Sequence, residues 1–320
     1  MAKKTGIAWT RSTFNPWIGC TKVGPGCDHC YAEALDARHK WGGAVHWGAG
    51  VPRYRTSEHL WKQPLKWDKE AAFEKRTGTM KGIPQDWTWT RPGFWPVFCA
   101  SLADVFDNEV SPQWRVDLWA LIDATPNLEW LIVTKRVGIV ASWMALWGWP
   151  ANARLLITVC NQEEADRDIP KLLALPCKNG ISYEPALGQV DWKTWLVPSL
   201  PYFTKAEAKR QSNPLFIDAG EIRSRIAHPD GVRLEWIIVG GESTQGAGKA
   251  RPFDLAWARS TVAQCKAAGV PVFVKQLGSH PVSFNTSPHD NKLYDVAIKN
   301  RAGADPTEWP EDLRIQQFPE

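Results

Sequence analysis

Three cysteines, Cys20, Cys27 and Cys30, lie within eleven positions of one glycine-rich stretch, with six residues between the first two and two between the second pair. The chain has seven cysteines in all, and the other four are scattered. An odd count with three clustered is typical of metal binding or catalysis in a reducing compartment rather than of disulfides. A structural zinc site needs four ligands, so three thiolates alone do not complete one.

Three thiolates suit an iron–sulfur cube, because they bind three of its four irons and leave the fourth open to an outside ligand. S-adenosylmethionine can bind that iron through its amino and carboxylate groups, and electron transfer then releases a 5′-deoxyadenosyl radical. Cys30 opens a predicted helix whose amino-terminal dipole would stabilise a negative cluster, and Tyr31 follows in position to pack against the cluster or an adenine. We therefore expect Cys20, Cys27 and Cys30 to bind a [4Fe–4S] cluster.

Two alternatives belong to other functional classes. The first is a nucleic-acid-binding module with a structural zinc ion, in which His29 or His39 supplies the fourth ligand. Its weakness is that His29 lies between two of the cysteines and that no second cysteine pair has zinc-ribbon spacing. The second is an iron–sulfur electron-transfer protein without radical chemistry, from which production of deoxyadenosine would distinguish a radical enzyme.

Buried strands must position this loop. The chain has 320 residues, of which 44% are hydrophobic and 22% charged, as expected for one large domain. Short apolar runs that end in polar or small residues are typical of strands buried on both faces of a parallel sheet. Such runs occupy residues 95–101, 129–135, 154–161, 180–185, 235–243 and 271–276.

Helices are predicted between these runs. Ser111 and Pro112 begin one as N-cap and first helical residue, and a second starts at Asp254 and stops at Gly269. Counting a first strand near the cysteine loop, the repeated strand-then-helix unit predicts an α/β fold with a complete or partial (β/α) barrel. An open doubly wound sheet is the alternative.

Active sites of such barrels lie where the strands end, and here those ends are polar. Two long segments, at about 41–92 and 187–233, interrupt the regular pattern as insertions. We expect the barrel with its insertions to span residues 1–280 and a surface-wrapping tail to span 281–320. The polar strand ends include Ser101, Asp104, Lys135, Arg136, Glu184, Glu242 and Lys275.

The first insertion alternates aromatic residues with arginines, which suits either stacking on nucleobases or a tightly packed loop. These residues are Trp47, Arg53, Tyr54, Arg55, Trp87, Trp89 and Arg91. The second insertion has a modest basic region. The alternative interpretation is that these residues form an ordinary solvated helix face. It comprises Lys205, Lys209, Arg210, Arg223, Arg225 and Arg233.

The net charge of +4 permits a nucleic-acid partner without demanding one. No apolar run approaches the roughly 18–20 residues of a membrane helix, and no apolar segment follows the two lysines near the amino terminus. We therefore expect no membrane partner and a cytoplasmic location, which is the host cytoplasm if the protein is phage-encoded.

The stretch "GCDHCYAEAL" resembles the cluster loop of radical S-adenosylmethionine (radical SAM) enzymes, although most members have three residues, not six, between the first two cysteines. More specifically, the chain resembles a phage and bacterial family with a three-cysteine motif, through "NPWIGCTKVGPGCDHCYA", "ASLADVFDNEVSPQW", "LIVTKR", "IIVGGES", "ARPFDLAWARS" and "GVPVFVKQLG". Phage relatives are implied to serve DNA hypermodification, in which amino-acid-like groups on a thymine methyl carbon are rearranged. The resemblance thus implies an isomerase or mutase that acts on DNA and needs an external electron donor.

The resemblance also implies roles for the polar strand ends. In many radical SAM enzymes a Gly-Gly-Glu segment after the second strand holds the cofactor's amino group, but here "GGES" follows a late strand. Ser101 and Asp104 take its place as candidates for the amino group, and Lys135 or Arg136 for the carboxylate. Glu184, Glu242 and Lys275 are candidates to face the substrate, or else they form a charge network inside the barrel mouth. Of the scattered cysteines Cys99, Cys160, Cys177 and Cys265, the first two close strands, where either could donate hydrogen or bind a metal unless it is an inert buried thiol.

Overall fold

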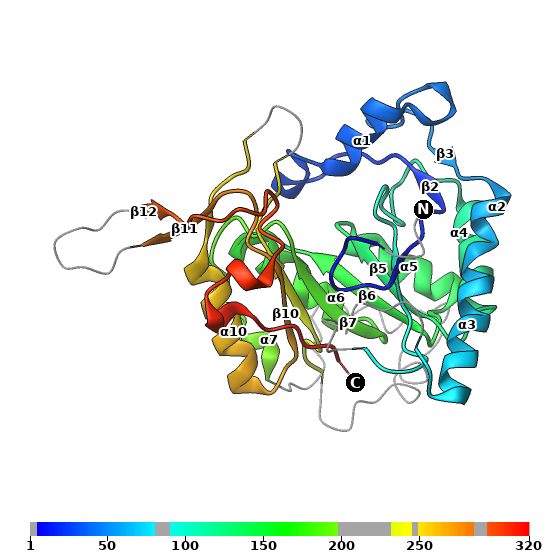
Figure 1. The fold of residues 1–320 in the computed structure, drawn as a ribbon. Coiled ribbons are helices and arrows are strands. Elements are labelled where there is room, and N and C mark those ends of the chain that lie inside the picture. Colours follow the sequence, from blue (N-terminus) through cyan, green and yellow to red (C-terminus); the bar gives the residue numbers. More distant parts are fainter. Residues whose placement is uncertain (1–4, 81–89, 198–231, 245–248, 285–292, 320) are drawn as a thin grey trace, which may run out of the picture.

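The computed structural model describes residues 5–80, 90–197, 232–244, 249–284 and 293–319. Its centre is a seven-stranded sheet in the order β1-β4-β5-β6-β7-β8-β10, in which every neighbouring pair is parallel (Figure 1). The strands are β1 (Ser12–Thr13), β4 (Pro96–Cys99), β5 (Glu129–Thr134), β6 (Ala153–Thr158), β7 (Lys178–Tyr183), β8 (Ile237–Gly240) and β10 (Val272–Gln276).

The strand order follows the chain order, so each crossover leads to the neighbouring strand in the same direction. A doubly wound sheet would reverse its order at a switch point, and that alternative is therefore wrong. The edge strands β1 and β10 are not paired with each other among the described residues, so the barrel is partial. The predicted α/β partial barrel is confirmed.

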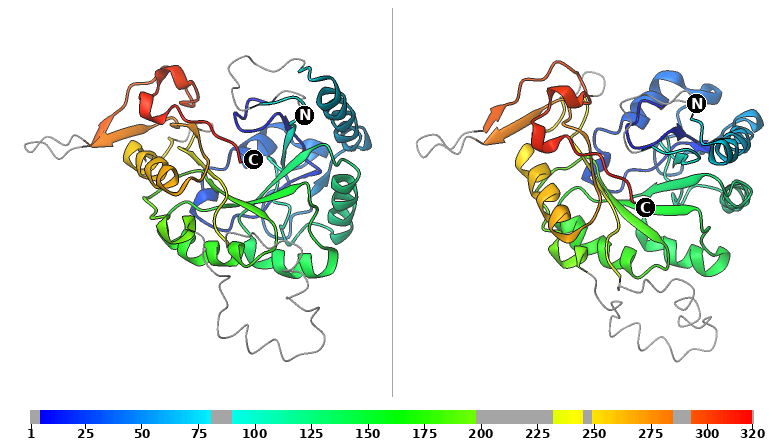
Figure 2. Two further views of the ribbon diagram at one scale, coloured as in Figure 1. Left: turned by 90° about the horizontal axis from the view of Figure 1, so that it is seen from below. Right: turned by 60° about the horizontal axis from the view of Figure 1, so that its bottom comes forward.

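Helices form an arc around the outside of the curved sheet (Figure 2). The α-helices are α1 (Tyr31–His39), α2 (Glu58–Trp61), α3 (Gln63–Thr77), α4 (Pro112–Asp123), α5 (Val137–Trp147), α6 (Gln162–Leu173), α7 (Lys193–Leu196) and α10 (Leu255–Ala268). The 3₁₀ turns are η1 (Pro25–Cys27), η2 (Trp41–Gly43), η3 (Pro306–Glu308) and η4 (Glu311–Leu313).

The predicted ends of two helices have a clear physical basis. The Asp254 side chain accepts a hydrogen bond from the N–H of Ala256 at 2.8 Å, and Gly269 ends α10 with a φ of 63°. Ser111 and Pro112 begin α4 as expected, but the Ser111 hydroxyl makes no capping hydrogen bond.

Alternating side chains give the sheet two separate cores. Phe98, Leu131 and Leu156 point to the concave face and form the inner core, whereas their strand neighbours, such as Val97 and Ile132, pack against the helices. Both ends of the chain contribute to the inner core, since the Trp9 ring packs at a tilt against Phe98 with ring centroids 4.7 Å apart, and Phe318 packs against the same core. Each large apolar side chain buried in this way contributes about 1.5–3 kcal/mol.

Two small sheets flank the barrel. β2 (Trp17–Ile18) pairs with β3 (Tyr54–Arg55), which fastens the cysteine loop to the first insertion. β9 (Phe253–Asp254), β11 (Pro281–Phe284) and β12 (Leu293–Asp295) form the second. Beyond it, the chain returns to β10, where the N–H of Val274 donates to the carbonyl of Ile315 at 2.8 Å. No helix among the described residues is long and apolar enough to cross a membrane.

Candidate functional site

The three clustered cysteines lie in the segment between β2 and α1, which crosses the upper side of the molecule in Figure 1. Gly19 precedes Cys20 with a φ of 110°, and a Cβ there would overlap the carbonyl oxygen of His46, so only glycine fits. Cys27 ends η1 and is buried, whereas Cys30 is the N-cap of α1 and, like Cys20, half-buried. All seven cysteines of the chain are free thiols.

Arg136, after β5, connects this loop to the sheet. Its Nη1 donates to Sγ of Cys20 at 3.4 Å and to Oδ2 of Asp104 at 3.0 Å. Asp104 also accepts from the hydroxyl of Thr134 at 2.7 Å and from the N–H of Lys135 at 2.9 Å. The two predicted cofactor ligands Asp104 and Arg136 are thus brought together, and Asp104 orients the turn that follows β5.

Gly26 lies at the closest approach of the loop to the barrel. A Cβ on Gly26 would lie 2.5 Å from Sγ of Cys160 and 3.3 Å from Cε of Lys135. The Nζ of Lys135 lies 3.4 Å from Oγ1 of Thr158 on β6. Burial lowers the pKa of Lys135, but the nearby thiolates, led by that of Cys27, outweigh burial and raise it. Cys160 therefore lies beneath the three-cysteine loop, and Lys135 provides a positive charge there.

Two of the loop cysteines, Cys20 and Cys30, have thiols that resist ionisation in the metal-free protein. Burial raises the pKa of the Cys20 thiol to about 12, despite the guanidinium of Arg136, and it also raises the pKa of Cys30. A metal must displace these protons on binding. The resulting negative charge would be balanced by Lys135, Arg136 and the amino terminus of α1.

Three clustered thiols are the donor set of a [4Fe–4S] cluster with one open iron, whereas a single zinc ion needs a fourth donor. The described residues contain no group of three or more His, Cys, Asp or Glu side chains placed to hold one metal ion. A single zinc ion needs its four donors to converge on one point. A [4Fe–4S] cluster does not, because each thiolate binds a different iron.

Tyr31 and Ser101 meet at the end of β4. The Tyr31 hydroxyl donates to the carbonyl oxygen of Ser101 at 2.6 Å, while 38% of the residue stays exposed. Asn15 Nδ2 donates to the Ser101 hydroxyl at 3.0 Å. Burial of the phenol, with Cys30 nearby, raises the pKa of Tyr31. Tyr31 therefore presents part of a neutral aromatic ring beside the cysteines.

Two of the three predicted substrate-facing residues form an ion pair. Nζ of Lys275, at the end of β10, lies 2.6 Å from Oε2 of Glu184, which follows β7. A Cβ on Gly26 would lie 3.6 Å from Cδ of Pro185, the residue after Glu184, so the pair lies on the same side of the barrel as the cysteine loop.

The third residue, Glu242, has different partners. Its Oε2 lies 2.8 Å from Nδ1 of His29, between two of the clustered cysteines, and its Oε1 accepts from Nη2 of Arg251 at 2.5 Å. Arg251 was not predicted as a site residue, because it lies far from the cysteines along the chain. His39, the other candidate zinc ligand, stacks near Trp41 with ring centroids 5.0 Å apart.

A second arginine, Arg53 of the first insertion, contacts Thr21, the residue after Cys20. Arg53, whose side chain is 0% exposed, pairs with Asp107 at 2.7 Å and donates to the Thr21 hydroxyl at 2.7 Å. The same guanidinium donates to the carbonyls of His46, Gly48 and Val51. Of the two interpretations of the first insertion, Arg53 fits the tightly packed loop.

The other described arginines of that insertion also stack on the protein itself. The Arg55 guanidinium lies 4.1 Å from the Trp61 ring centroid, and that of Arg91 lies 4.5 Å from Phe94. In the second insertion, Arg233 donates to the carbonyl of Ala268 at 3.2 Å. Several aromatic and basic residues singled out in the two insertions lie outside the described residues, namely Trp87, Trp89, Lys205, Lys209, Arg210, Arg223 and Arg225.

The remaining cysteines differ from Cys160. Cys99, Cys177 and Cys265 are buried in the outer core among apolar side chains. Burial raises the pKa of all three thiols. They therefore have the environment of inert buried thiols, whereas Cys160 contacts the loop.

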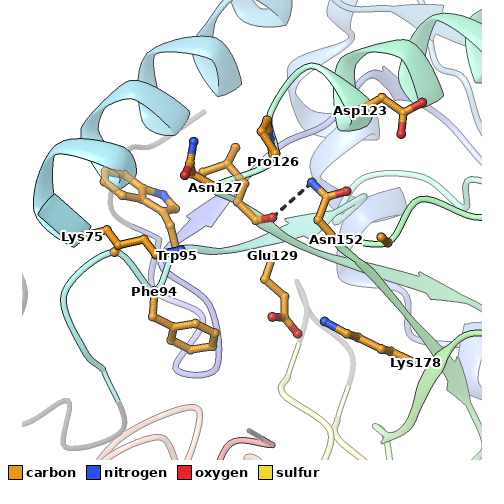
Figure 3. A pocket seen from close by; sticks show the side chains of 12 residues that line it. Lys75, Phe94, Trp95, Asp123, Pro126, Asn127, Glu129, Asn152 and Lys178 are labelled. Carbon is orange, nitrogen blue, oxygen red and sulfur yellow. Dashed lines mark hydrogen bonds between the residues drawn. The ribbon is translucent and has the colours of Figure 1, made fainter.

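A cavity of about 550 Å³ lies at the opposite end of the sheet, where β4, β5 and β7 begin (Figure 3). Trp95, Asn152 and Lys178 are among its lining side chains, and Asn152 Nδ2 donates to the carbonyl of Leu128 at 3.3 Å. None of the predicted site residues lines this cavity.

Comparisons with known proteins place the sequence in one family without giving it a reaction. The model of the family described as "Protein of unknown function (DUF5131)" matches residues 4–303. No curated protein matches the sequence. A solved structure of a mutant spore photoproduct lyase, with bound AdoMet and dinucleoside spore photoproduct, is similar at a TM-score of 0.35 and 12% identity. The match covers 72% of this chain and 56% of that one, a likeness too distant to indicate a shared reaction.

Proposed function

We propose that this chain, which belongs to the DUF5131 family of proteins of unknown function, is a radical SAM enzyme in which Cys20, Cys27 and Cys30 bind a [4Fe–4S] cluster. One observation carries the proposal. The three thiols lie on one loop against the polar ends of a parallel partial barrel, where Arg136 contacts Cys20 and Gly26 abuts Lys135. This edge of a parallel barrel is where catalytic groups gather.

The cluster and S-adenosylmethionine, when bound, supply a 5′-deoxyadenosyl radical that abstracts hydrogen from a substrate. Lys135 and Arg136 provide cations for the cofactor's carboxylate, and the exposed part of the Tyr31 ring provides a surface for its adenine. Ser101 is tied to Asn15 and Tyr31, which fixes the end of β4 beside that ring. An external one-electron donor is required as a partner.

We further propose a modified thymine base of phage DNA as the substrate, with a rearrangement of its substituent as the reaction. The Lys275–Glu184 ion pair supports this, because an amino-acid-like group carries a carboxylate for Lys275 and an ammonium for Glu184. A base within duplex DNA would have to be flipped out of the stack to reach this pair.

The test uses protein purified and reconstituted without oxygen. About four irons per chain and formation of 5′-deoxyadenosine after reduction with S-adenosylmethionine are expected. Cys27→Ala should lose both, whereas Cys177→Ala, a buried thiol of the outer core, should retain them. Normal iron binding by Cys27→Ala would overturn the proposal. Zinc in place of iron would favour the binding module, and a cluster that never cleaves the cofactor would favour electron transfer.

A further inference from the structure

The cysteine loop is also attached to the barrel by side chains other than its cysteines. Arg251, just before β9, donates through Nη2 to Oε1 of Glu242 at 2.5 Å and through Nη1 to the carbonyl oxygen of Pro25 at 2.9 Å. Pro25 opens the turn that ends in Cys27. One guanidinium therefore joins the loop to the carboxylate that follows β8.

A second connection runs through His29. Its Nδ1 lies 2.8 Å from Oε2 of Glu242, and this same oxygen accepts from the N–H of Arg251 at 2.9 Å. Both sides of the Cys27 turn are thus held by the Glu242 carboxylate, one through Arg251 and the other directly. An additional ion pair between Arg251 and Asp28, at 3.2 Å, is exposed on its Asp28 side and contributes little.

The backbone around Glu242 is itself fixed by close packing. A Cβ on Gly241 would lie 2.5 Å from the carbonyl oxygen of Leu277, and a Cβ on Gly278 would lie 2.6 Å from the carbonyl oxygen of Glu242. That carbonyl accepts from the N–H of Ser279 at 2.8 Å. The glycines of "GGES" and "KQLG" therefore let the ends of β8 and β10 approach each other, which sets the position of the carboxylate.

The Glu242 carboxylate is ionised, and both of its oxygens are occupied by polar contacts. Glu242 is 7% exposed, and both of its oxygens have partners. Burial raises the pKa of Glu242, but the hydrogen bonds from Arg251 outweigh burial and lower it. A carboxylate held in this way is suited to hold a segment in place, not to accept a proton from a substrate.

We propose that Glu242 and Arg251 are positioning residues that hold residues 25–29 over the carboxyl end of β8, so that the cysteine loop is ordered before any metal binds. In this proposal Glu242 holds the loop and does not face the substrate. Only the cluster measurements below depend on the proposed function, because the loop contacts belong to the metal-free protein.

The first test is hydrogen exchange in metal-free full-length protein. In the native chain the N–H of Cys27 donates to the Gly24 carbonyl at 2.9 Å. Arg251→Gln and Glu242→Gln should speed exchange of the amides of residues 26–29 by about tenfold, since each removes a charged partner from a buried contact. Arg259→Gln breaks an exposed pair with Asp312 and is the matched control, with no expected change at the loop. Unchanged loop exchange in both test variants would overturn the proposal.

The second test separates positioning from general stability. The melting temperature of Arg251→Gln should stay close to that of Arg259→Gln, while a chelator removes iron from the reconstituted protein about tenfold faster. Arg251→Lys keeps the charge but reaches only one of the two oxygens, so it should restore part of the iron retention. Equal iron loss in Arg251→Lys and Arg251→Gln, or a fall in melting temperature that accounts for the loss, would contradict a positioning role.

The two proposals can fail separately. If Cys27→Ala binds iron normally while the exchange results hold, the assignment of the cluster is wrong and the fastening of the loop stands. If the exchange results fail while Cys27→Ala loses iron, the cluster assignment stands and the loop is ordered by other contacts.

Discussion

Arg136 donates through Nη1 both to the sulfur of Cys20, at 3.4 Å, and to Oδ2 of Asp104, at 3.0 Å. The cysteine loop is therefore joined to the first two long strands of the sheet by one guanidinium, because Asp104 follows β4 and Arg136 follows β5. Burial and the Asp104 carboxylate raise the pKa of the Cys20 thiol, and the Arg136 guanidinium offsets part of that rise.

Asp104→Asn tests this junction. The change keeps the shape of the side chain but removes the charge that pairs with buried Arg136, and an Asn amide cannot accept at both positions. We expect the free energy of unfolding to fall by about 2–4 kcal/mol, measured by urea denaturation of metal-free protein. Arg167→Gln, which breaks a half-exposed pair with Asp168, should cost less than about 1 kcal/mol. Equal effects of the two changes would contradict a structural role for the Asp104–Arg136 pair.

Gly26→Ala tests the contact between the loop and Cys160. The new methyl group would overlap Sγ of Cys160, so we expect reduced iron binding on reconstitution. Cys160→Ala removes that sulfur, and the double variant should recover most of the iron, as measured by iron and sulfide content. Gly138→Ala is the control, since nothing lies within 4 Å of a Cβ there and the change favours helix α5. A double variant no better than Gly26→Ala would show that the sulfur is not what the methyl group meets.

Arg53→Met should destabilise the whole loop region. The substitution removes the close ion pair of buried Asp107 and the side-chain donor that the carbonyls of residues 46, 48 and 51 share. A loss of about 3–5 kcal/mol is expected, by analogy with other buried pairs broken on one side. Urea denaturation measures it, and limited proteolysis should cut first between residues 41 and 55. A loss below about 1 kcal/mol, the range of exposed pairs, would be incompatible with this burial.

The sequence predicted the sheet well because each long strand is buried on both faces and so has a continuous apolar run. β5 and β6 coincide closely with the runs at 129–135 and 154–161. The fifteen-residue helix α3, by contrast, was not predicted within the first insertion. The buried residues of α3 include Trp67, Ala71 and Glu74. An apolar pattern does not reveal a buried glutamate, and the burial of Glu74 depends on its ion pair with Arg11 at 2.7 Å.

The site was predictable where local spacing carries the information and not where distant residues meet. The three cysteines share one loop, and the polar strand ends follow from the parallel sheet. Arg251 lies about 220 residues along the chain from the loop it contacts. In the sequence Cys160 resembles any other strand cysteine, and only the structure shows that it lies next to Gly26. Such partners are determined by how the whole chain folds into the partial barrel, and no local motif encodes that.

Binding of DNA provides a test of the proposed substrate. If a base in DNA is the substrate, the affinity of the protein for DNA should fall steeply between 50 and 200 mM salt, because released counterions drive contacts to phosphates. Turnover on a free nucleoside should be poor under the same conditions. Fluorescence anisotropy with a labelled duplex measures the first, and product analysis the second. Turnover that is equal on nucleoside and duplex, with no dependence on salt, would indicate a small-molecule substrate instead.

Lys275→Met tests whether the ion pair at the barrel mouth contacts the substrate and not the cofactor. The change leaves the Glu184 carboxylate, which is only 11% exposed, without its partner at 2.6 Å, and it removes the cation proposed for the substrate's carboxylate. We expect formation of 5′-deoxyadenosine without substrate to persist within about twofold, while product formation falls at least about 100-fold. Glu184→Gln should behave in the same way, because it removes the other half of the pair. A parallel loss of 5′-deoxyadenosine in both variants would move the pair to the cofactor, and unchanged product formation would remove it from the site.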